Sequence, residues 1–366
     1  MNPQIDKIVE KEGVLTFTLS GVNVSLANAI RRTVLSDIPT VVFKTSPNED
    51  NKSKILVNTT RFNNEIIKQR LSCIPIHIDD IEIPLKNYLL EVNMENTSDT
   101  IMYITTEHFK IKNMLTNEYL SSKDTHNIFP PNDMGYYIDF VRLRPQISEN
   151  IPGEKLQMTC EFSINNAKTD GMFNVVSCCS YGFTVDDVYM EKELDKKKQE
   201  WKDRRLSKHD IEFESDNWKL LEGKRIVKKD CFDFTIQTIG VFSNRDLIKQ
   251  ACKIIMTRLD NLKTIIETDA IKISESENTM KHSYDVILEN EDYTIGKIIE
   301  YMLYTKFFEE AKTMTFCGFK KMHPHDIDSV IRVAYKEPAD MAMVKQNLLI
   351  SISLATNVYE TILGKF

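Results

Sequence analysis

"VNVSLANAIRRTVLSDIP", residues 22–39, decides the fold, and it carries two adjacent arginines in the middle of an apolar pattern. We predict a short amphipathic helix here, with Ser25 as its N-cap and with Pro39 preventing its continuation. The apolar residues that recur at helical spacing are Leu26, Ala27, Ile30 and Val34. The two arginines, Arg31 and Arg32, leave three targets open: nucleic acid, a small anion or another protein.

A second polar cluster lies in "NTTRFNNEIIKQRLSCIP", residues 58–75, where we predict another short helix. In an ordinary surface helix, one arginine of an adjacent pair is solvated and the other lies beside the apolar stripe. The density of polar groups favours a binding surface, because the planar guanidinium suits bidentate partners such as carboxylates. The apolar side of the second helix comprises Phe62, Ile66, Ile67 and Leu71. The polar side chains of both predicted helices are Asn28, Arg31, Arg32, Arg61, Glu65, Lys68 and Arg70.

Several segments alternate between apolar and polar residues, which predicts strands with one buried face. The clearest are "GVLTFTLSG" (13–21), "IPIHIDDIEI" (74–83), "KLQMTCEFSI" (155–164), "VVSCCSYGF" (175–183) and "FDFTIQTIG" (232–240). Residues 80 to about 155 are polar and rich in turns between short apolar runs, which indicates a β-rich insert.

Two long apolar stripes predict two long helices. Burying five or more large aliphatic side chains of one stripe is worth roughly 10 kcal/mol before entropy, so each stripe requires a long partner surface. The first stripe comprises Leu247, Ile248, Ala251, Ile254, Ile255, Leu259, Leu262 and Ile266. The second comprises Met341, Val344, Leu348, Ile352, Ala355, Tyr359 and Ile362.

The two ends of the chain resemble each other. Without gaps, "LSGVNVSLANAI" (19–30) lies over "LENEDYTIGKII" (288–299). The matched pairs are Ser25 with Thr294 as N-caps, Leu26 with Ile295, Ile30 with Ile299, and Val34 with Leu303. Each half therefore has the order strand, capped short helix, later strand and long helix, and we predict a degenerate repeat that pairs about a pseudo-two-fold axis.

Composition limits the classes of function. The chain has 366 residues, 42% hydrophobic and 28% charged, which is typical of a globular protein of two or three domains. Its net charge of −7 argues against phosphate binding as the main role. Seven cysteines without a CxxC pair indicate buried free thiols in a reducing compartment. No signal peptide or membrane-spanning run is evident, so we expect an intracellular protein.

Three other motifs have a structural explanation that we favour. "KKKQEWKDRR" (196–205) could bind nucleic acid with Trp201 stacking on bases, but interrupting acids favour a solvated charged helix or connection. "HPH" (323–325) fits a turn between strands better than a metal site. Cys178 and Cys179 fit the two faces of a strand better than a nucleophile. None of the 11 glycines forms a phosphate-binding loop, and we find no catalytic arrangement.

The sequence resembles the alpha-type assembly subunits of cellular RNA polymerases. "VSLANAIRRTVLSDIPT" is similar to their N-terminal signature, and "NTTRFNNEIIKQRLSCIPI" to the second signature of the larger eukaryotic and archaeal alpha-like subunit. "FDFTIQTIGVFSNRDLIKQACKIIMTRL" resembles the final strand and dimer helix of that subunit. From about residue 280, "EDYTIGKIIEYML" and "FCGFKKMHPHDIDSVIRV" resemble the smaller alpha-like subunit.

This resemblance implies an α+β fold with two alpha-type dimerisation modules, fused in one chain, and a β-rich insert in the first. We expect the first module at 1–79 and 156–268, with a charged segment at 190–230, and the insert at 80–155. A linker is expected at 269–280 and the smaller module at 281–366. The residues expected at the seam between modules are Leu247, Ala251, Ile254, Ile255, Leu259, Leu262, Ile295, Ile299, Leu348, Ile352, Ala355 and Tyr359.

The resemblance also implies a non-catalytic platform for the two largest polymerase subunits, chiefly the second-largest, and for small assembly subunits. The residues expected to dock the large subunits are Asn28, Arg31, Arg32, Arg61, Glu65 and Arg70. We expect no cofactor or metal, because residues 80–155 lack the cysteine ligands of some relatives, and no sequence-specific DNA contact. Fusion is similar to the arrangement in polymerases of large cytoplasmic DNA viruses, which implies host cytoplasm and virion. The alternatives are a stand-alone nucleic-acid-binding protein and an enzyme with a dispersed site.

Overall fold

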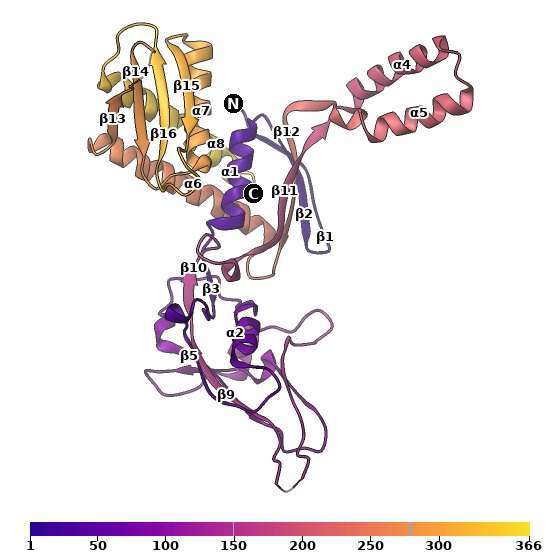
Figure 1. Cartoon of the computed structure of the whole chain (residues 1–366), viewed down its shortest axis with the longest axis vertical. Helices are drawn as coiled ribbons and strands as arrows, with labels where there is room; N and C mark the ends of the chain where they lie inside the picture. The colour runs from indigo at the N-terminus through magenta and orange to yellow at the C-terminus, as the bar shows by residue number, and fades with distance from the viewer. Residues whose placement is uncertain (149, 278–279) are drawn as a thin grey trace. The chain divides into compact units, whose positions relative to one another are not determined.

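The computed structural model describes residues 1–148, 150–277 and 280–366, which form a mixed α/β protein with several sheets (Figure 1). The chain divides into two compact units. Unit 1 comprises 1–34, 178–237 and 244–366, and unit 2 comprises 35–177 and 238–243. Within the described part of the chain, no helix combines the length and the apolarity needed to cross a bilayer.

The first sheet of unit 1 has the strand order β1-β2-β12-β11. Strand β2 is antiparallel to both β1 and β12, and the Phe17 and Phe234 rings stack across the β2–β12 pair with centroids 5.0 Å apart. The predicted strands at 13–21, 175–183 and 232–240 are confirmed. The strands are β1 (Gln4–Lys11), β2 (Val14–Ser20), β11 (Val176–Val185) and β12 (Val227–Thr238).

The second sheet of unit 1 has the order β13-β14-β16-β15, and all its neighbouring strands are antiparallel. The predicted turn at 323–325 is confirmed, because the histidines lie between β15 and β16. The predicted linker at 269–280 is in part a strand, and its residues 278 and 279 lie outside the described residues. The strands are β13 (Lys272–Glu275), β14 (Ser283–Leu288), β15 (Met314–Lys320) and β16 (Ser329–Tyr335).

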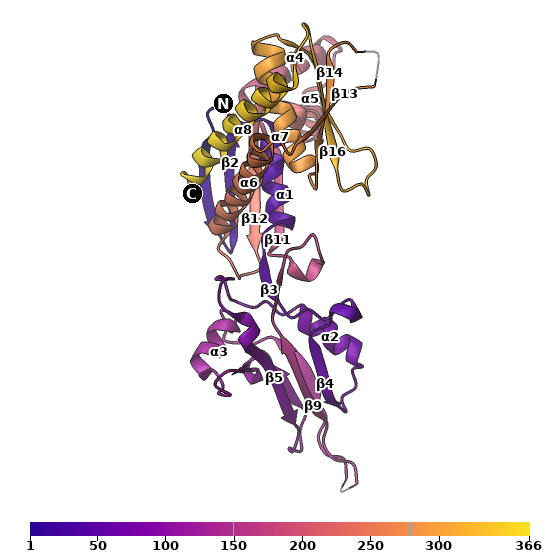
Figure 2. The ribbon, with the colours of Figure 1, turned by 90° about the vertical axis from the view of Figure 1, so that its left-hand side faces the viewer.

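Two short and two long helices pack with these sheets. The short helices are α1 (Val24–Ser36) and α7 (Tyr293–Leu303), and a π-helical segment, Tyr304–Glu310, follows α7. The long helices are α6 (Asn244–Glu267) and α8 (Met341–Leu363), which contact each other along the two predicted stripes (Figures 1 and 2). All the residues expected at the seam are at most 5% exposed, apart from Ile254, which is half-buried. Met341 of the second stripe is exposed, because it occupies the first turn of α8.

A helical hairpin connects β11 and β12, within the charged segment at 190–230. It consists of α4 (Asp187–Asp203), α5 (Lys208–Leu220) and the 3-10 turn Gly223–Arg225. The two helices lie against each other and extend away from the sheet of β11 and β12 (Figure 1). Few of their side chains are buried, which agrees with the prediction of a charged helix.

Unit 2 has a four-stranded sheet in the order β4-β9-β5-β7 and two smaller sheets, β6-β8 and β3-β10. Its strands are β3 (Thr40–Val42), β4 (Ser53–Asn58), β5 (Tyr88–Glu95), β6 (Met102–Thr105), β7 (Lys110–Asn113), β8 (Asp139–Leu143), β9 (Lys155–Glu161) and β10 (Ser163–Asn165). Its helices are α2 (Asn64–Ser72) and α3 (Ser122–Ile128), with 3-10 turns at Asn48–Asp50, Leu85–Asn87, Thr106–His108 and Gly171–Phe173.

One prediction for unit 2 is wrong, and the bounds of the insert expected at 80–155 stay a prediction. The segment lies within unit 2, where Phe43, Ile67 and Leu71 share one core with the strands of the sheet. Residue 149 of that insert lies outside the described residues. The strand expected at 74–83 is wrong, although Ile74 and Ile76 are buried as its alternation required. The segment is irregular, and the amide of His77 donates to the carbonyl of Ile128 instead of joining a ladder.

Candidate functional site

Helix α1 begins at Val24, about two turns before Arg31, and its capping residue lies two residues before the one predicted from the sequence. The side chain of Asn23 accepts a hydrogen bond from the amide of Ser25 at 2.9 Å, so Asn23 is the capping residue. The same correction holds in α7, where the side chain of Asp292 accepts from the amide of Thr294 at 2.9 Å. Ser, Asn and Asp are all good caps, so composition alone could not choose among them.

Arg31 is directed along α1 and toward the first sheet. Its Nε donates to Oδ1 of Asn28 at 2.9 Å, which fixes the guanidinium one turn from its own backbone. Burial raises the pKa of the Cys179 thiol on β11 to about 12, and the nearby positive charge of Arg31 opposes that rise. Burial also raises the pKa of Tyr181, and the positive charge of Arg31 again opposes the rise. Asn28, Arg31 and Tyr181 are half-buried, so they form a polar surface over α1 and β11.

Arg32 is engaged by the other half of unit 1, which the prediction did not foresee. Its Nη2 donates to the Asp292 carboxylate at 3.0 Å, and its Nε donates to Oγ1 of Thr294 at 2.9 Å. The Asp292 carboxylate thus accepts hydrogen bonds from a backbone amide of α7 and from the guanidinium of Arg32. The docking role expected for Arg32 stays a prediction, and the structure adds that its guanidinium binds the N-terminus of α7.

A second arginine joins this contact from α6. Arg258 forms a two-pronged ion pair with Glu291, and its Nη2 lies 3.6 Å from Oδ1 of Asp292. Both members of the Arg258–Glu291 pair are only 16% exposed at their side chains, so solvent screens them weakly. The acidic pair 291–292 therefore joins α1, α6 and α7 through charge-assisted hydrogen bonds.

One buried tyrosine of α8 forms a hydrogen bond with the backbone of α1. Tyr359 of α8 is fully buried, and its hydroxyl donates to the carbonyl of Leu26 at 3.2 Å. Burial raises its pKa well above the ordinary value, so the hydroxyl remains a donor at neutral pH. Asn347 of the same helix donates to the hydroxyl of Tyr335 on β16 at 3.0 Å. These bonds satisfy polar groups that an apolar seam would otherwise leave unpaired.

The other predicted docking residues, Arg61, Glu65 and Arg70, belong to unit 2. Arg61 and Glu65 are both exposed. Arg61 lies just before α2, and Glu65 lies in its first turn. Arg70 instead braces β8, because its Nε and Nη2 donate to the carbonyls of Phe140 and Asp139, each at 2.7 Å. Asn28, Arg31 and Arg32 belong to unit 1, so the six residues do not form one surface within either unit.

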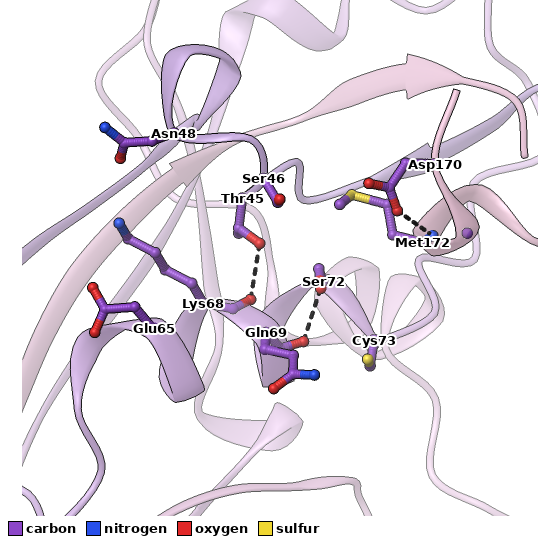
Figure 3. A pocket seen from close by; sticks show the side chains of 11 residues that line it. Thr45, Ser46, Asn48, Glu65, Lys68, Gln69, Ser72, Cys73, Asp170 and Met172 are labelled. Atoms are coloured by element: carbon purple, nitrogen blue, oxygen red, sulfur yellow. Dashed lines mark hydrogen bonds between the residues drawn. The ribbon is translucent and has the colours of Figure 1, made fainter. Parts of the chain in front are cut away.

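An open polar cleft of about 790 Å³ lies beside α2 in unit 2 (Figure 3). Glu65 and Lys68 line it from α2, and the loop around Ser46 and the turn at Asp170 line it from the opposite side. Its rim is fixed by internal bonds, such as that from the Thr45 hydroxyl to the Lys68 carbonyl at 3.1 Å. Most of the side chains that line the cleft are polar, among them Asn48, Gln69 and Ser72.

The cysteines are free, and most are unsuited to nucleophilic chemistry. Burial raises the pKa of four thiols to about 12, so these thiols are protonated at neutral pH; they are Cys160, Cys179, Cys252 and Cys317. The expectation of buried thiols is wrong for Cys73, which is exposed at the end of α2. Among the described residues, no three His, Cys, Asp or Glu side chains are grouped as metal ligands.

Several residues of this site were missed from the sequence. Glu291 and Asp292 lie within the repeated segment, but their arginine partners are distant in the chain. Arg258 lies 33 residues from Glu291, and Arg32 lies 260 residues from Asp292. The only available signal was "NEDYT", two acids directly before a helix. Arg258 lies in the long stripe of α6 as a charged residue only 16% exposed at its side chain, which the apolar pattern alone does not explain.

The profile of the RNA polymerase Rpb3/Rpb11 dimerisation domain matches residues 16–259, which is more than half of the chain. The chain belongs to this family. The matched segment runs from β2 through α1, unit 2 and the hairpin into α6.

Individual members of the family are similar to the chain at low identity. The DNA-directed RNA polymerases I and III subunit rpac1 of Dictyostelium discoideum is 26% identical over 49% of this chain and 52% of its own length. Subunit RPAC1 of Bos taurus is 23% identical over 74% of this chain and 86% of its own. Subunit Rpo3 of Pyrococcus furiosus is 31% identical over 27% of this chain and 38% of its own. The chain thus spans about half the length of the Dictyostelium relative and most of the bovine one.

Proposed function

We propose that this chain is a non-catalytic assembly subunit of a DNA-directed RNA polymerase, in which two alpha-like modules pair within one polypeptide. The observation that carries the proposal is the family match over residues 16–259, which includes α1 and most of α6. The names of the similar proteins, all polymerase subunits, support the same role. The second module would lie beyond the matched segment and supply α7 and α8.

The arrangement of unit 1 supports a pair of related modules. Both sheets have the same strand order, since β1, β2, β12 and β11 correspond in turn to β13, β14, β16 and β15. The gap-free alignment of 19–30 with 288–299 places Asn23 over Asp292, so the capping residues of α1 and α7 are equivalent. Strand pairing supplies a second register: Thr16 pairs with Thr235, and the residue equivalent to Thr16, Asp285, pairs with Arg332.

This second register extends without gaps into the long helices. Placing Thr235 over Arg332 also places Asn244 over Met341, the first residues of α6 and α8. The buried positions that coincide are Leu247 with Val344, Ala251 with Leu348, Ile255 with Ile352, and Leu262 with Tyr359. Agreement in two separate registers favours a repeated module over a chance likeness.

Fusion has an energetic consequence. Two separate subunits lose an estimated 4–15 kcal/mol of translational and rotational freedom on association. A covalent connection replaces that loss with a smaller loop-closure term and fixes equal stoichiometry. In this proposal residues 269–280 join the modules, although β13 lies within them.

Docking of the large subunits is assigned to the residues of the predicted set whose side chains do not hold another helix or strand in place. We place Asn28 and Arg31 on one docking surface with β11, and Arg61 and Glu65 on another in unit 2. Arg31 is suited to this role because its guanidinium is half-buried and oriented by Asn28, which reduces the entropy lost on binding. Arg32 and Arg70 would act indirectly, by holding α1 and α2 in place.

The test is co-purification of the tagged full chain with the two largest subunits of its polymerase, identified by mass spectrometry. We expect both to be recovered, and recovery of neither overturns the proposed role. Arg31→Glu should sharply reduce recovery of the second-largest subunit, whereas Lys11→Glu, at an exposed position on β1, should leave it unchanged. Equal recovery with both variants would show that α1 is not the docking surface.

Intramolecular pairing has its own measurement. If the modules pair within the chain, the isolated protein should have the 42.5 kDa mass of one chain by light scattering at all concentrations. A mass that doubles as concentration rises would indicate pairing between chains and contradict this part of the proposal.

A further inference from the structure

The α4–α5 hairpin has an uneven distribution of charge that a platform role does not use. Its tip, residues 196–209, contains seven lysines and arginines and two acidic residues, a net charge of +5 with histidine neutral. The flanking parts of the hairpin, 186–195 and 210–222, each carry −4. In a chain of net charge −7, positive charge is therefore concentrated at the tip.

Only the first lysines of the tip are neutralised by the acids that interrupt the run. These ion pairs join side chains three residues apart on one exposed helix, and such pairs are weak. They are Lys196 with Glu193 at 2.6 Å, Lys197 with Glu200 at 2.9 Å, and Lys198 with Asp195 at 3.7 Å. The remaining acid of the tip, Asp203, accepts a hydrogen bond from Gln199 at 3.1 Å.

Four cations around the turn between the helices remain available: Lys202, Arg204, Arg205 and Lys208. All four are exposed, and within the described residues none of them forms an ion pair. Arg205 occupies the left-handed region at φ 62° in the turn itself, so the chain reverses here and brings the ends of α4 and α5 together. The reversal gathers charges from both helices at one end of the hairpin.

The tip lacks the apolar surface that a protein partner would need. Between residues 196 and 212, all of which the structure describes, no large apolar side chain is exposed. Interfaces between proteins have an apolar, aromatic-rich centre from which lysine is depleted. Trp201 is half-buried, so it is not presented as a platform for stacking bases. Cations without apolar surroundings fit the sugar-phosphate backbone of nucleic acid.

We propose that the tip of the α4–α5 hairpin binds the phosphate backbone of nucleic acid without sequence preference. The acidic flanks of the hairpin repel phosphates and confine the contact to the tip. The segment 196–205 is largely a solvated charged helix, as predicted, and the acids that pair with its first three lysines leave the turn positive. The inference is independent of the polymerase role, since it concerns a contact that the isolated chain makes.

The test uses the full chain and a short fluorescein-labelled DNA duplex, with anisotropy measured at two salt concentrations. Four phosphate contacts predict a slope of about −3.6 in log affinity against log salt, so affinity should fall roughly a hundredfold between about 50 and 200 mM salt. Two duplexes of equal length and unrelated sequence should bind equally. A variant with alanine at Lys202, Arg204, Arg205 and Lys208 should lose most of the binding and most of the slope.

The matched control removes the same charge elsewhere. Alanine at the exposed residues Lys7, Lys54, Lys86 and Lys123 also brings the net charge from −7 to −11. The control should bind like the unaltered chain. Equal weakening of both variants, or no binding by the unaltered chain at low salt, would overturn the proposal. Polyglutamate can be compared with unlabelled DNA as a competitor. If polyglutamate displaced the duplex as readily as the DNA, the partner would be an acidic protein segment, and the proposal would be overturned.

Discussion

The segment from β2 through α1 and the segment from β14 through α7 are built alike and charged differently. Each short helix follows a strand, begins at an Asx cap and buries an apolar side. At the positions of Arg31 and Arg32, the second segment has Glu300 and Tyr301. Positions that pack are therefore matched between the segments, whereas positions that face other partners are not.

The differing charges have separate uses in the structure. Arg32 donates a hydrogen bond to Asp292, the capping residue of the other segment. Glu300 instead accepts a hydrogen bond from the amide of Phe319 at 3.1 Å and forms an ion pair with Lys297. Arg31, at the position that matches Glu300, instead donates to Asn28 of its own helix. Two segments of similar build can in this way carry different charged groups.

The largest expected effect tests whether the packing positions are equivalent. Leu26→Ala and Ile295→Ala each remove a fully buried side chain at matched positions. Each should lower the free energy of unfolding by about 2–5 kcal/mol, from lost burial and from the cavity that remains. Urea unfolding followed by circular dichroism measures both. A loss confined to one of the two would show that the segments do not share a packing plan.

The next effect concerns a position where the two segments differ by one methyl group. A Cβ at Gly296 would lie 1.9 Å from the ring of Phe319, whereas the matched residue of α1 is Ala27, whose Cβ is buried. Gly296→Ala should therefore destabilise the protein by about 1–3 kcal/mol despite the better helix propensity of alanine.

The reverse change supplies the control for this prediction. Ala27→Gly should cost only about 1 kcal/mol, through helix propensity. The thermal unfolding midpoints of the two variants can be compared directly. If Gly296→Ala stabilised the protein, Phe319 would have another position available, and the close approach would not determine the choice of glycine.

A smaller effect separates the two caps. Asn23→Ala should cost about 0.5–2 kcal/mol as the loss of an ordinary N-cap. Asp292→Ala should cost more, because it also removes the partner of Arg32 and a contact of Arg258. Asp292→Asn keeps the cap but loses the charge, so its stability should lie between that of the parent and that of the alanine variant. Equal costs at Asn23 and Asp292 would mean that the arginine contacts contribute nothing measurable.

Much of this fold could be predicted because its signals are local. The stripes of α6 and α8 and the alternation of β2 and β12 each depend on neighbouring residues with a strong period, and the structure confirms these elements. The turn at 323–325 was equally local, since proline between two histidines excludes a helix. The family was recognisable from the same local signatures.

The failures share a dependence on partners distant in the chain. The strand expected at 74–83 had the correct alternation, but the amide of His77 donates to the carbonyl of Ile128, at a helix end more than 50 residues along the chain. The partner of Arg32 lies 260 residues away, so nothing in its local sequence distinguished it from Arg31. The uneven charge of the hairpin is present along the sequence, but its position at one end of a hairpin depends on the turn between α4 and α5.

The smallest effect depends on pH and sharpens the comparison at the strands. The matched residues Thr16 and Asp285 face Thr235 and Arg332 across their sheets. Hydrogen bonds from Arg332, at 2.6 and 2.7 Å, lower the pKa of Asp285, and a bond from Ser276 adds to this. Because the pKa is lower in the folded state, the contact stabilises the protein above the unfolded pKa of about 3.9, and this stability is lost as pH falls through the folded value.

Asp285→Asn should therefore lower the unfolding midpoint slightly at pH 7, by the equivalent of about 0.5 kcal/mol for a half-exposed pair, and have a smaller effect at pH 3. Thr16→Ser, at the matched position, should shift the midpoint equally at both pH values, because no titrating group is removed. Thermal scans from pH 7 to pH 3 measure the difference. A constant gap between Asp285→Asn and the parent across this range would mean that Arg332 does not favour the ionised carboxylate, and that the two sheets differ at this position only in packing.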